Sequence, residues 1–277
     1  MRAPMAARTT IAIPCYDDEE TIGEAVQSAL SQTVADLEVV VVDDGSPVPV
    51  AELLADVRDD RLRIVTAPHG GVGRARNLAL AAVRTPLLSH LDADDVWEPD
   101  YLEHVLPCFD DAAVVLAYPN MRVFGLAGSE GPYIDDPERH PIDRFPELVA
   151  DGNPLPYACT VRTEAVRAIG GYPEFLWGAH DWWLTLMLAA EGRRFAYVDR
   201  MLVRYRWAPS SLSNDYERVQ STDFQLLWRF VLRHPTIPGP HKRLLRLAAI
   251  RAAKHVPGAR RLRSAQLARA QRDRASR

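Results

Sequence analysis

Short apolar runs alternate with amphipathic stretches through the first hundred residues of the chain. Four runs rich in Val, Ile and Leu predict buried strands at residues 9–15, 37–42, 62–66 and 87–91. Between them, apolar residues recur at helical spacing, as in Ile22, Val26 and Leu30, and predict helices within residues 21–33, 50–57 and 74–83. This order of elements predicts a mostly parallel, twisted α/β sheet flanked by helices.

The pattern loosens after residue 100. Residues 125–156 are rich in Gly, Pro and acids, which indicates a long functional loop with a short helix near 145–149. The other predicted elements are helices at 101–109, 164–169, 180–190 and 216–233 and strands at 113–118, 159–162, 195–198 and 202–207. Because no repeat or clean linker interrupts this series, residues 9 to about 235 are interpreted as one domain.

Composition narrows the class of protein. Of the 277 residues, 47% are hydrophobic and 25% charged, which is typical of a globular domain. Cys15, Cys108 and Cys159 show no paired spacing, so neither a disulfide framework nor a zinc site is expected, and a reducing cytoplasm fits. No apolar run approaches the roughly 18 residues of a membrane span, and no signal-peptide core precedes Ile11.

Charge is distributed unevenly along the chain. Residues 241–277 hold 12 Lys or Arg and one acid, Asp273, a net charge of +11. Because the whole chain carries −4, the first 240 residues carry −15. A basic C-terminal segment of this kind is typical of contact with phosphates or with an anionic membrane surface.

Carboxylates follow two of the predicted strands at the point where each ends. Asp43 and Asp44 come after one strand, and Asp92, Asp94 and Asp95 after another. Carboxyl ends of strands in open α/β sheets bind ligands, and clustered carboxylate oxygens suit Mg²⁺ or Mn²⁺. The alternative is structural: a solvated acidic turn before the helix near residue 99, and a plain turn at residues 43–46.

Seven segments occur in an order that carries a family resemblance. They are IAIPCYDDEETIGEAVQSALSQT, EVVVVDDGS, GGVGRARNLAL, LDADD, RTEAVRAIGGYPE, HDWWLTLMLAAEG and VRYRWAPSSLS, between residues 11 and 213. Each segment alone is a weak signal, whereas the ordered series is specific. The chain resembles family 2 glycosyltransferases, whose nucleotide-diphospho-sugar-binding fold is called GT-A.

The resemblance implies a metal-dependent, inverting transferase. Its donor would be a UDP-, GDP- or dTDP-sugar, and its acceptor a hydroxyl of a glycan, a lipid-linked sugar or a natural product. The resemblance assigns Mn²⁺ or Mg²⁺ to Asp94 with Asp92, and the general base to Asp181. It assigns the donor nucleotide to Pro14, Tyr16, Asp43, Asp44, Arg76 and Asp92, and contacts with the acceptor or sugar to Asp95, His180, Trp182 and Trp183.

Plainer roles for several of these residues stay open. Asp181 begins a predicted helix, where an acid interacts favourably with the helix dipole. His180 could cap that helix, and the neighbouring tryptophans could pack in the core. Arg76 follows a glycine turn, where it could bind phosphate or lie on the surface.

The chain departs from the family pattern at three positions. His180 and Trp183 stand where the family often has acids, and Ala208 stands where it often has a histidine. A second function is therefore a non-catalytic member of the fold that binds a nucleotide-sugar. A third, a sugar nucleotidyltransferase, would want a glycine-rich loop after the first strand, where this chain has PCYD.

The resemblance divides the chain into three parts. Residues 1–8 are expected to be flexible, and residues 9–235 to form the transferase domain, with a nucleotide-binding half at 9–100 and an acceptor-binding half at 101–235. Residues 236–277 would form a basic, helical and partly disordered tail. Within it, Leu245, Ala249, Ala252 and Val256 share one side of a helical wheel that Leu247 and Ile250 interrupt. The expected location is cytoplasmic, with peripheral membrane contact through this tail and no nucleic-acid partner.

Overall fold

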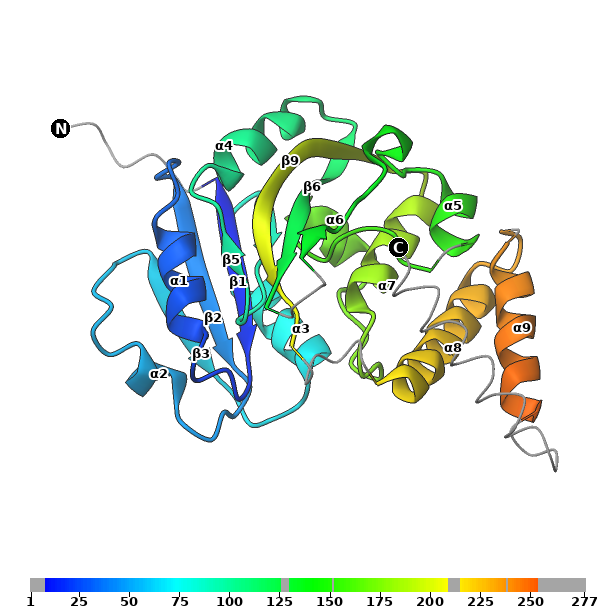
Figure 1. The fold of residues 1–277 in the computed structure, drawn as a ribbon, viewed down its shortest axis with the longest axis horizontal. Helices are drawn as coiled ribbons and strands as arrows, with labels where there is room; N and C mark the ends of the chain where they lie inside the picture. Colours follow the sequence, from blue (N-terminus) through cyan, green and yellow to red (C-terminus); the bar gives the residue numbers. More distant parts are fainter. Residues whose placement is uncertain (1–7, 126–129, 151, 209–214, 238, 254–277) are drawn as a thin grey trace.

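The computed structural model describes residues 8–125, 130–150, 152–208, 215–237 and 239–253. Of the segments predicted to be flexible or partly disordered, 1–8 and 236–277, residues 1–7, 238 and 254–277 lie outside the described range. Among the described residues, strands form a mixed sheet in the order β3-β2-β1-β4-β8-β6-β9-β5, with β7 paired to β6 (Figure 1). Helices cover both faces of this sheet, so the predicted α/β class is confirmed.

The first half of the chain forms the parallel part of the sheet. Strands β2, β1 and β4 run parallel to one another, as do β2 and β3. The strands of this half are β1 (Thr9–Cys15), β2 (Leu37–Asp43), β3 (Leu62–Thr66), β4 (Leu87–His90) and the short β5 (Val96–Trp97). Its helices are α1 (Ile22–Leu30), α2 (Val50–Leu53), α3 (Val72–Ala82) and α4 (Tyr101–Val105), followed by the 3₁₀ helix η1 (Leu106–Asp110).

Alternation along the strands explains why their sequences are apolar throughout. Ile11 and Ile13 of β1 point into one core with α1, whereas Ala12 points into the other core with α3. Val39 to Val42 of β2 alternate in the same way, and all are fully buried. A strand covered on both faces has no polar side to present, which is the pattern that predicted this sheet.

The second half of the chain adds antiparallel pairing. β8 (Thr160–Arg162) runs antiparallel to both β4 and β6 (Val114–Phe124), which in turn pairs parallel with β9 (Arg194–Arg206). The remaining elements are β7 (Gly131–Pro132), η2 (Pro137–Arg139), α5 (Phe145–Ala150), α6 (Thr163–Ala168), α7 (His180–Ala190), α8 (Tyr216–Arg233) and α9 (Pro240–Ala253).

Three element predictions in this half need correction. The predicted helix at 101–109 changes to a 3₁₀ helix at Leu106, because Pro107 lacks the N–H that a continuing α-helix needs. The strand predicted to end at Tyr118 continues to Phe124. The two strands predicted at 195–198 and 202–207 are one strand, β9, whose register against β6 shifts near Asn120.

Helices α8 and α9 form an antiparallel hairpin at the end of the molecule opposite β1–β3 (Figure 1). The buried side of α9 carries Leu244 and Leu247 instead of the predicted apolar side, so Leu247, which interrupted the helical wheel, belongs to the core. Leu245, Ala249 and Ala252 are exposed, while Val256 lies outside the described residues. In the part of the chain that the structure describes, no helix has the length and apolar character needed to cross a bilayer.

Gly73 lets α3 approach the segment before α7. A Cβ atom at this position would lie 2.7 Å from the Pro173 carbonyl oxygen and 2.6 Å from Nε2 of His180. At Gly23, the corresponding second residue of α1, a Cβ atom would meet no atom within 4 Å. The two glycines therefore have similar helix positions and opposite surroundings.

We expect Gly73→Ala to lower the free energy of unfolding by about 1–3 kcal/mol, because the added methyl group overpacks a backbone contact. Gly23→Ala should raise it by a few tenths to about 1 kcal/mol, since alanine has the higher helix propensity. Urea denaturation of both variants measures the difference. A stabilising effect of Gly73→Ala would contradict this close packing.

Candidate active site

The parallel strands bring three loops to one edge of the sheet. Cys15 at the end of β1 is paired with Asp43 at the end of β2, and Ala12 with His90 at the end of β4. The chain therefore leaves all three strands on the same side, which places residues 16–18, 44–46 and 91–95 around one edge. The predicted carboxylates belong to these loops.

Asp95 holds the acidic turn in place. It is fully buried and accepts hydrogen bonds from the Tyr157 hydroxyl and, at 2.6 Å, from the backbone N–H of Arg206. The Arg206 guanidinium also donates to the Asp94 carbonyl at 2.8 Å. The two carboxylate oxygens thus fasten the turn to Tyr157 and to β9, and the predicted contact of Asp95 with a sugar stays a prediction.

Asp92 and Asp94 are half-buried at this edge, and a third carboxylate, Asp18, faces them from the loop after β1. Burial, together with the charges of Asp92 and Asp18, raises the pKa of Asp94 to about 7. Burial likewise raises the pKa of Asp18, with Asp92 and Asp17 adding to it. The site thus concentrates negative charge that a cation would relieve.

The donor set fits a divalent ion that arrives with a diphosphate. Among the described residues, no group of three or more His, Cys, Asp or Glu side chains is arranged to hold a metal on its own. Mg²⁺ is commonly bound by one or two carboxylates together with substrate phosphates. Asp92 and Asp94 offer such oxygen ligands, and the mutual repulsion that raises the pKa of Asp94 is what a bound cation removes.

Asp43 and Asp44 organise the neighbouring loops. Asp43 accepts from the backbone N–H groups of Ser46 (2.8 Å) and Val50 (3.1 Å). The two oxygens of Asp44 accept from Gly70 N–H (2.9 Å) and Gly71 N–H (2.7 Å). Both carboxylates are almost completely buried, and their hydrogen bonds fix the loops around them. Their assignment to the donor nucleotide stays a prediction.

Tyr16 lies at the mouth of the same edge. Its side chain is 46% exposed, and its ring lies 4.0 Å from that of His69 between centroids, at an interplanar angle of 32°. Nδ1 of His69 is 3.0 Å from the Asp44 carboxylate. Pro14 is a partly buried residue of β1, paired with Val42. An accessible aromatic face beside the loop carrying Asp44 is suited to stacking a planar ligand group.

Arg76 connects the first half of the chain to the second. It lies on α3, is only 8% exposed, and donates through Nη2 to Asp92 at 3.0 Å. Its charge also acts on Asp181, which lies about a hundred residues later. Its Nε is buried and finds no hydrogen-bond partner among the described residues, which is the condition of a site that a ligand completes.

Asn77, the next residue of α3, explains how Asp181 comes close to Arg76. Its side chain donates to the Tyr172 carbonyl at 2.9 Å and accepts from the Tyr172 N–H at 2.8 Å. This pair of hydrogen bonds fixes the turn at residues 170–173 against α3. The segment that follows the turn then begins α7 at His180, and so places Asp181 beside Arg76.

Asp181 is half-buried and accepts a hydrogen bond of 2.6 Å from the Asn153 amide. Burial raises the pKa of Asp181, whereas the positive charge of Arg76 and a hydrogen bond from the backbone N–H of Trp182 lower it. A carboxylate with an orienting amide and a raised pKa has the properties of a general base. Asp92, Arg76 and Asp181 are therefore brought together as the predicted site requires.

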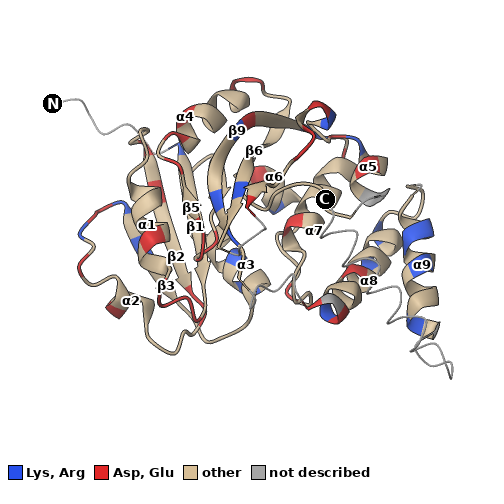
Figure 2. Ribbon diagram, viewed as in Figure 1, with Lys and Arg blue, Asp and Glu red and all other residues tan. Residues whose placement is uncertain are grey.

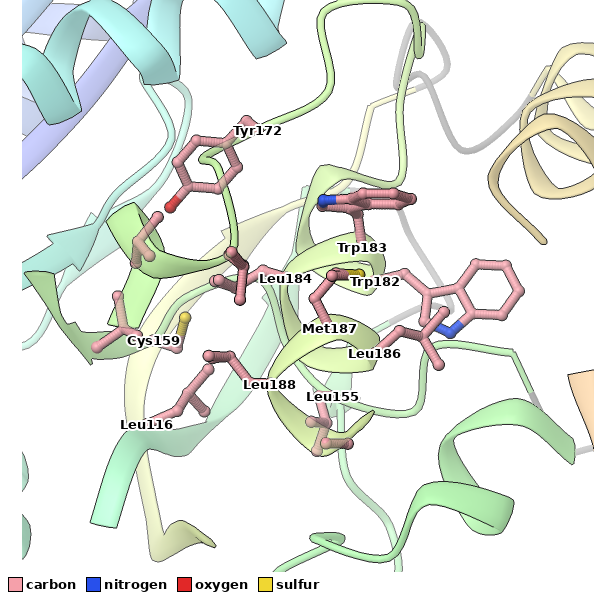
Figure 3. Close-up of a cluster of buried hydrophobic side chains, with 14 of the residues drawn as sticks. Leu116, Leu155, Cys159, Tyr172, Trp182, Trp183, Leu184, Leu186, Met187 and Leu188 are labelled. Carbon is pink, nitrogen blue, oxygen red and sulfur yellow. The ribbon is translucent and has the colours of Figure 1, made fainter. Parts of the chain in front are cut away.

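The other predicted acceptor contacts lie in the core. Trp182 is 1% and Trp183 7% exposed, and Figure 3 shows both indoles among apolar side chains around α7. His180 is 1% exposed and its Nε2 lies 3.1 Å from the Pro173 carbonyl. Burial lowers the pKa of His180 to about 3, with Arg76 adding to the effect, so the ring is neutral. None of the three presents a face to a sugar, because α7 turns them toward the interior.

Sequence reasoning missed Asp18, Asn153, Tyr157 and Arg206. Asp18 lies three residues after β1, and this position places it on the same edge as Asp92. Asn153 lies in a segment without periodicity, and nothing in the sequence pairs it with Asp181. Tyr157 and Arg206 carried no signal, because their partner Asp95 is more than 60 residues away.

The comparisons with known proteins now decide the family. The sequence model described as "Glycosyl transferase family 2" matches residues 10–163, more than half of the chain. The chain belongs to glycosyl transferase family 2. It is 34% identical over 140 residues to the succinoglycan biosynthesis protein ExoO of Rhizobium meliloti strain 1021, covering 50% of this chain and 39% of ExoO. It is 36% identical over 123 residues to chondroitin synthase of Pasteurella multocida strain Pm70, covering 43% of this chain and 13% of that protein.

Solved structures show the same GT-A fold. The mannosyltransferase PcManGT from Pyrobaculum calidifontis, in complex with GDP-Man and Mn²⁺, matches with a TM-score of 0.65 and 20% identity. The match covers 96% of this family 2 chain and 81% of PcManGT. TarS from S. aureus, in complex with UDP-GlcNAc, matches with a TM-score of 0.66 and 18% identity, over 81% of this chain and 66% of that one.

The crowding of Asp94 predicts a cost in stability. A carboxyl group whose pKa is about 7 in the folded state and 3.8 in the unfolded state binds its proton more tightly when folded. In EDTA, stability should therefore fall as pH rises from about 4 to 7 and stay low above that. Asp94→Asn removes the charge that causes this loss.

We expect metal-free Asp94→Asn to melt about 2–8 °C above the wild type at pH 8, corresponding to about 1–2 kcal/mol after solvent screening. At pH 5 the difference should shrink. Asp56→Asn, at an exposed carboxylate in the turn after α2, serves as the control and should show neither effect. Differential scanning calorimetry in EDTA measures the three proteins, and an unchanged or lower melting temperature for Asp94→Asn at pH 8 would contradict the crowding.

Proposed function

We propose that this chain transfers a sugar, with inversion, from a nucleotide-diphospho-sugar to a hydroxyl acceptor. The observation that carries this proposal is that Arg76 donates a hydrogen bond to the carboxylate of Asp92 while its charge also acts on the carboxylate of Asp181. Arg76 thereby links the acidic, metal-compatible edge to Asp181, the half-buried candidate base, within one site. The family supports the reaction class, and the solved neighbours bound to UDP-GlcNAc and GDP-Man support a nucleotide-sugar donor.

The donor occupies the edge formed after β1, β2 and β4. Asp94 and Asp92 would hold Mn²⁺ or Mg²⁺ together with the diphosphate. When bound, the ion would act as a Lewis acid that neutralises the charge of the leaving group. The nucleotide lies toward Tyr16 and the loops that Asp43 and Asp44 fix, with Pro14 beneath it. This arrangement makes residues 9–100 the nucleotide-binding half and residues 101–235 the acceptor-binding half.

Asp181 takes the proton of the acceptor hydroxyl. The acceptor oxygen attacks the anomeric carbon on the face opposite the diphosphate, and the bond from that carbon to the diphosphate oxygen breaks as the new one forms. The electron pair of the broken bond leaves with the nucleoside diphosphate. Asn153 orients the carboxylate, and the positive charge of Arg76 opposes the rise in the pKa of Asp181 that burial causes.

The acceptor is a hydroxyl of a glycan, a lipid-linked sugar or a natural product, and the chain works at the cytoplasmic side of a membrane. The non-catalytic alternative gains no support from two of the departures, because His180 and Trp183 lie in the core rather than at the site. Ala208 lies just beyond β9 and offers no ligand for a metal. Metal binding therefore depends on Asp92, Asp94 and the donor itself.

The base assignment predicts a selective loss of turnover. Asp181→Asn keeps the size of the side chain but removes the proton acceptor, so kcat should fall by about 10²- to 10⁴-fold while donor affinity changes little. Asn153→Ala should lower kcat less, because it disturbs only the orientation of the base. Glu191→Gln at the other end of α7 is the matched control. Transfer assays with calorimetric donor binding measure all three, and near-normal turnover of Asp181→Asn would place the base elsewhere.

The metal assignment predicts donor binding that depends on a divalent ion. Isothermal calorimetry with UDP-, GDP- and dTDP-sugars should show binding of one donor in Mn²⁺ and at least a tenfold loss of affinity in EDTA. Asp94→Asn should show the weaker affinity in both conditions, whereas Asp56→Asn should behave as the wild type. Equal affinities with and without EDTA would refute the role of the ion.

A further inference from the structure

The outer face of the α8–α9 hairpin carries large apolar side chains that the fold leaves uncovered. Trp228 and Leu232 of α8 are 49% and 64% exposed, and Leu245 of α9 is 70% exposed. Leu226, Leu227 and Phe230 on the other side of α8 are fully buried. The hairpin therefore satisfies its own packing and still presents a second apolar surface.

Contacts of the two helices indicate that these three side chains point away from the core. Trp228 lies seven residues, two helical turns, after Ser221, whose hydroxyl accepts from Arg251 of α9 at 3.1 Å. Leu232 follows one turn later. On α9, Arg243 points inward, 3.4 Å from Asp223 and with its guanidinium 5.0 Å from the centre of the Trp182 ring. Leu245 is two residues, about 200°, further around that helix and so points outward.

The charge of α9 has one sign. It carries Lys242, Arg243, Arg246 and Arg251 and no acid, and Figure 2 shows this helix with blue segments and none in red. Lys242 and Arg246 are exposed, as is Arg233 at the end of α8. In the sequence, residues 254–277 add eight more Lys or Arg against Asp273. Exposed cationic side chains therefore accompany the apolar ones on both helices of the hairpin.

We propose that this outer face binds the surface of an anionic membrane. Trp228, Leu232 and Leu245 enter the interface between headgroups and acyl chains, where the amphipathic indole is most favourable. Lys242, Arg246 and Arg233 are attracted to the acidic headgroups. A protein partner would need a complementary acidic surface, whereas an anionic bilayer supplies negative charge and an apolar layer together.

Docking in this way orients the molecule. The hairpin lies at the end of the fold opposite β1–β3, and its inner side contacts α5 and α7, the helix that carries Asp181 (Figure 1). The membrane would therefore lie on the acceptor side of the chain, with the nucleotide-binding loops away from it. Binding itself requires neither donor nor turnover, so it can be tested apart from the proposed transfer reaction.

Sedimentation with vesicles tests the proposal on the full chain. The wild type should bind vesicles of phosphatidylcholine and phosphatidylglycerol (7:3), bind pure phosphatidylcholine vesicles at least about tenfold more weakly, and be released by salt. The apolar variant Trp228→Ser/Leu232→Ser/Leu245→Ser and the charge variant Lys242→Glu/Arg246→Glu should each lose at least about tenfold in partitioning. The controls are Met201→Ser, an exposed apolar residue on β9, and Arg58→Glu near α2, and both should bind as the wild type does.

Three outcomes would overturn the proposal. The first is binding by the apolar and charge variants equal to that of the wild type. The second is equal binding of the wild type to charged and neutral vesicles. The third is a wild-type dimer in solution that the apolar variant dissociates, since the face would then be an interface between two copies. Far-ultraviolet circular dichroism and calorimetric donor binding confirm that each variant is folded.

Discussion

Repulsion among carboxylates at one edge of the sheet is the constraint to which the rest of the site responds. Asp18, Asp92 and Asp94 meet there because three parallel strands end side by side. Arg76 offsets part of this repulsion through its hydrogen bond to Asp92, and its charge also acts on Asp181. One buried guanidinium thus interacts with both the acidic edge and the candidate base.

The acids of the site fall into two groups according to their hydrogen bonds. Asp43, Asp44 and Asp95 are buried and accept from backbone N–H groups, and so they fix loops. Asp92, Asp94 and Asp181 are half-buried. Of these, Asp94 and Asp181 have pKa values that are raised mainly by burial. Raised pKa values of this kind are typical of functional sites. Asp95 makes the turn rigid through its hydrogen bonds, so Asp92 and Asp94 keep their positions despite the repulsion between their charges.

Much of this arrangement follows from the sequence, and the part that does not has a physical cause. Strands β1 to β4 bury both faces, so their apolar runs and the acids at their ends could be recognised directly. The hydrogen bond from Asn153 to Asp181 joins a segment without local periodicity to the start of α7, and so left no pattern in the sequence. Trp182 and Trp183 resembled sugar-stacking residues, but only packing decides that α7 turns both indoles inward. Leu247 was ambiguous in the same way, because only packing decides that it is buried in the core.

The central claim is that donor, divalent ion and base share one site across the two halves of the chain. A crystal structure with Mn²⁺ and a nucleotide-diphospho-sugar, with Mn²⁺ located by its anomalous scattering, tests this claim most directly. It should show the ion bound to Asp94 and the diphosphate, with the Asp181 carboxylate on the side of the anomeric carbon opposite the leaving group. An ion away from Asp92 and Asp94, or a sugar that faces away from Asp181, would contradict it.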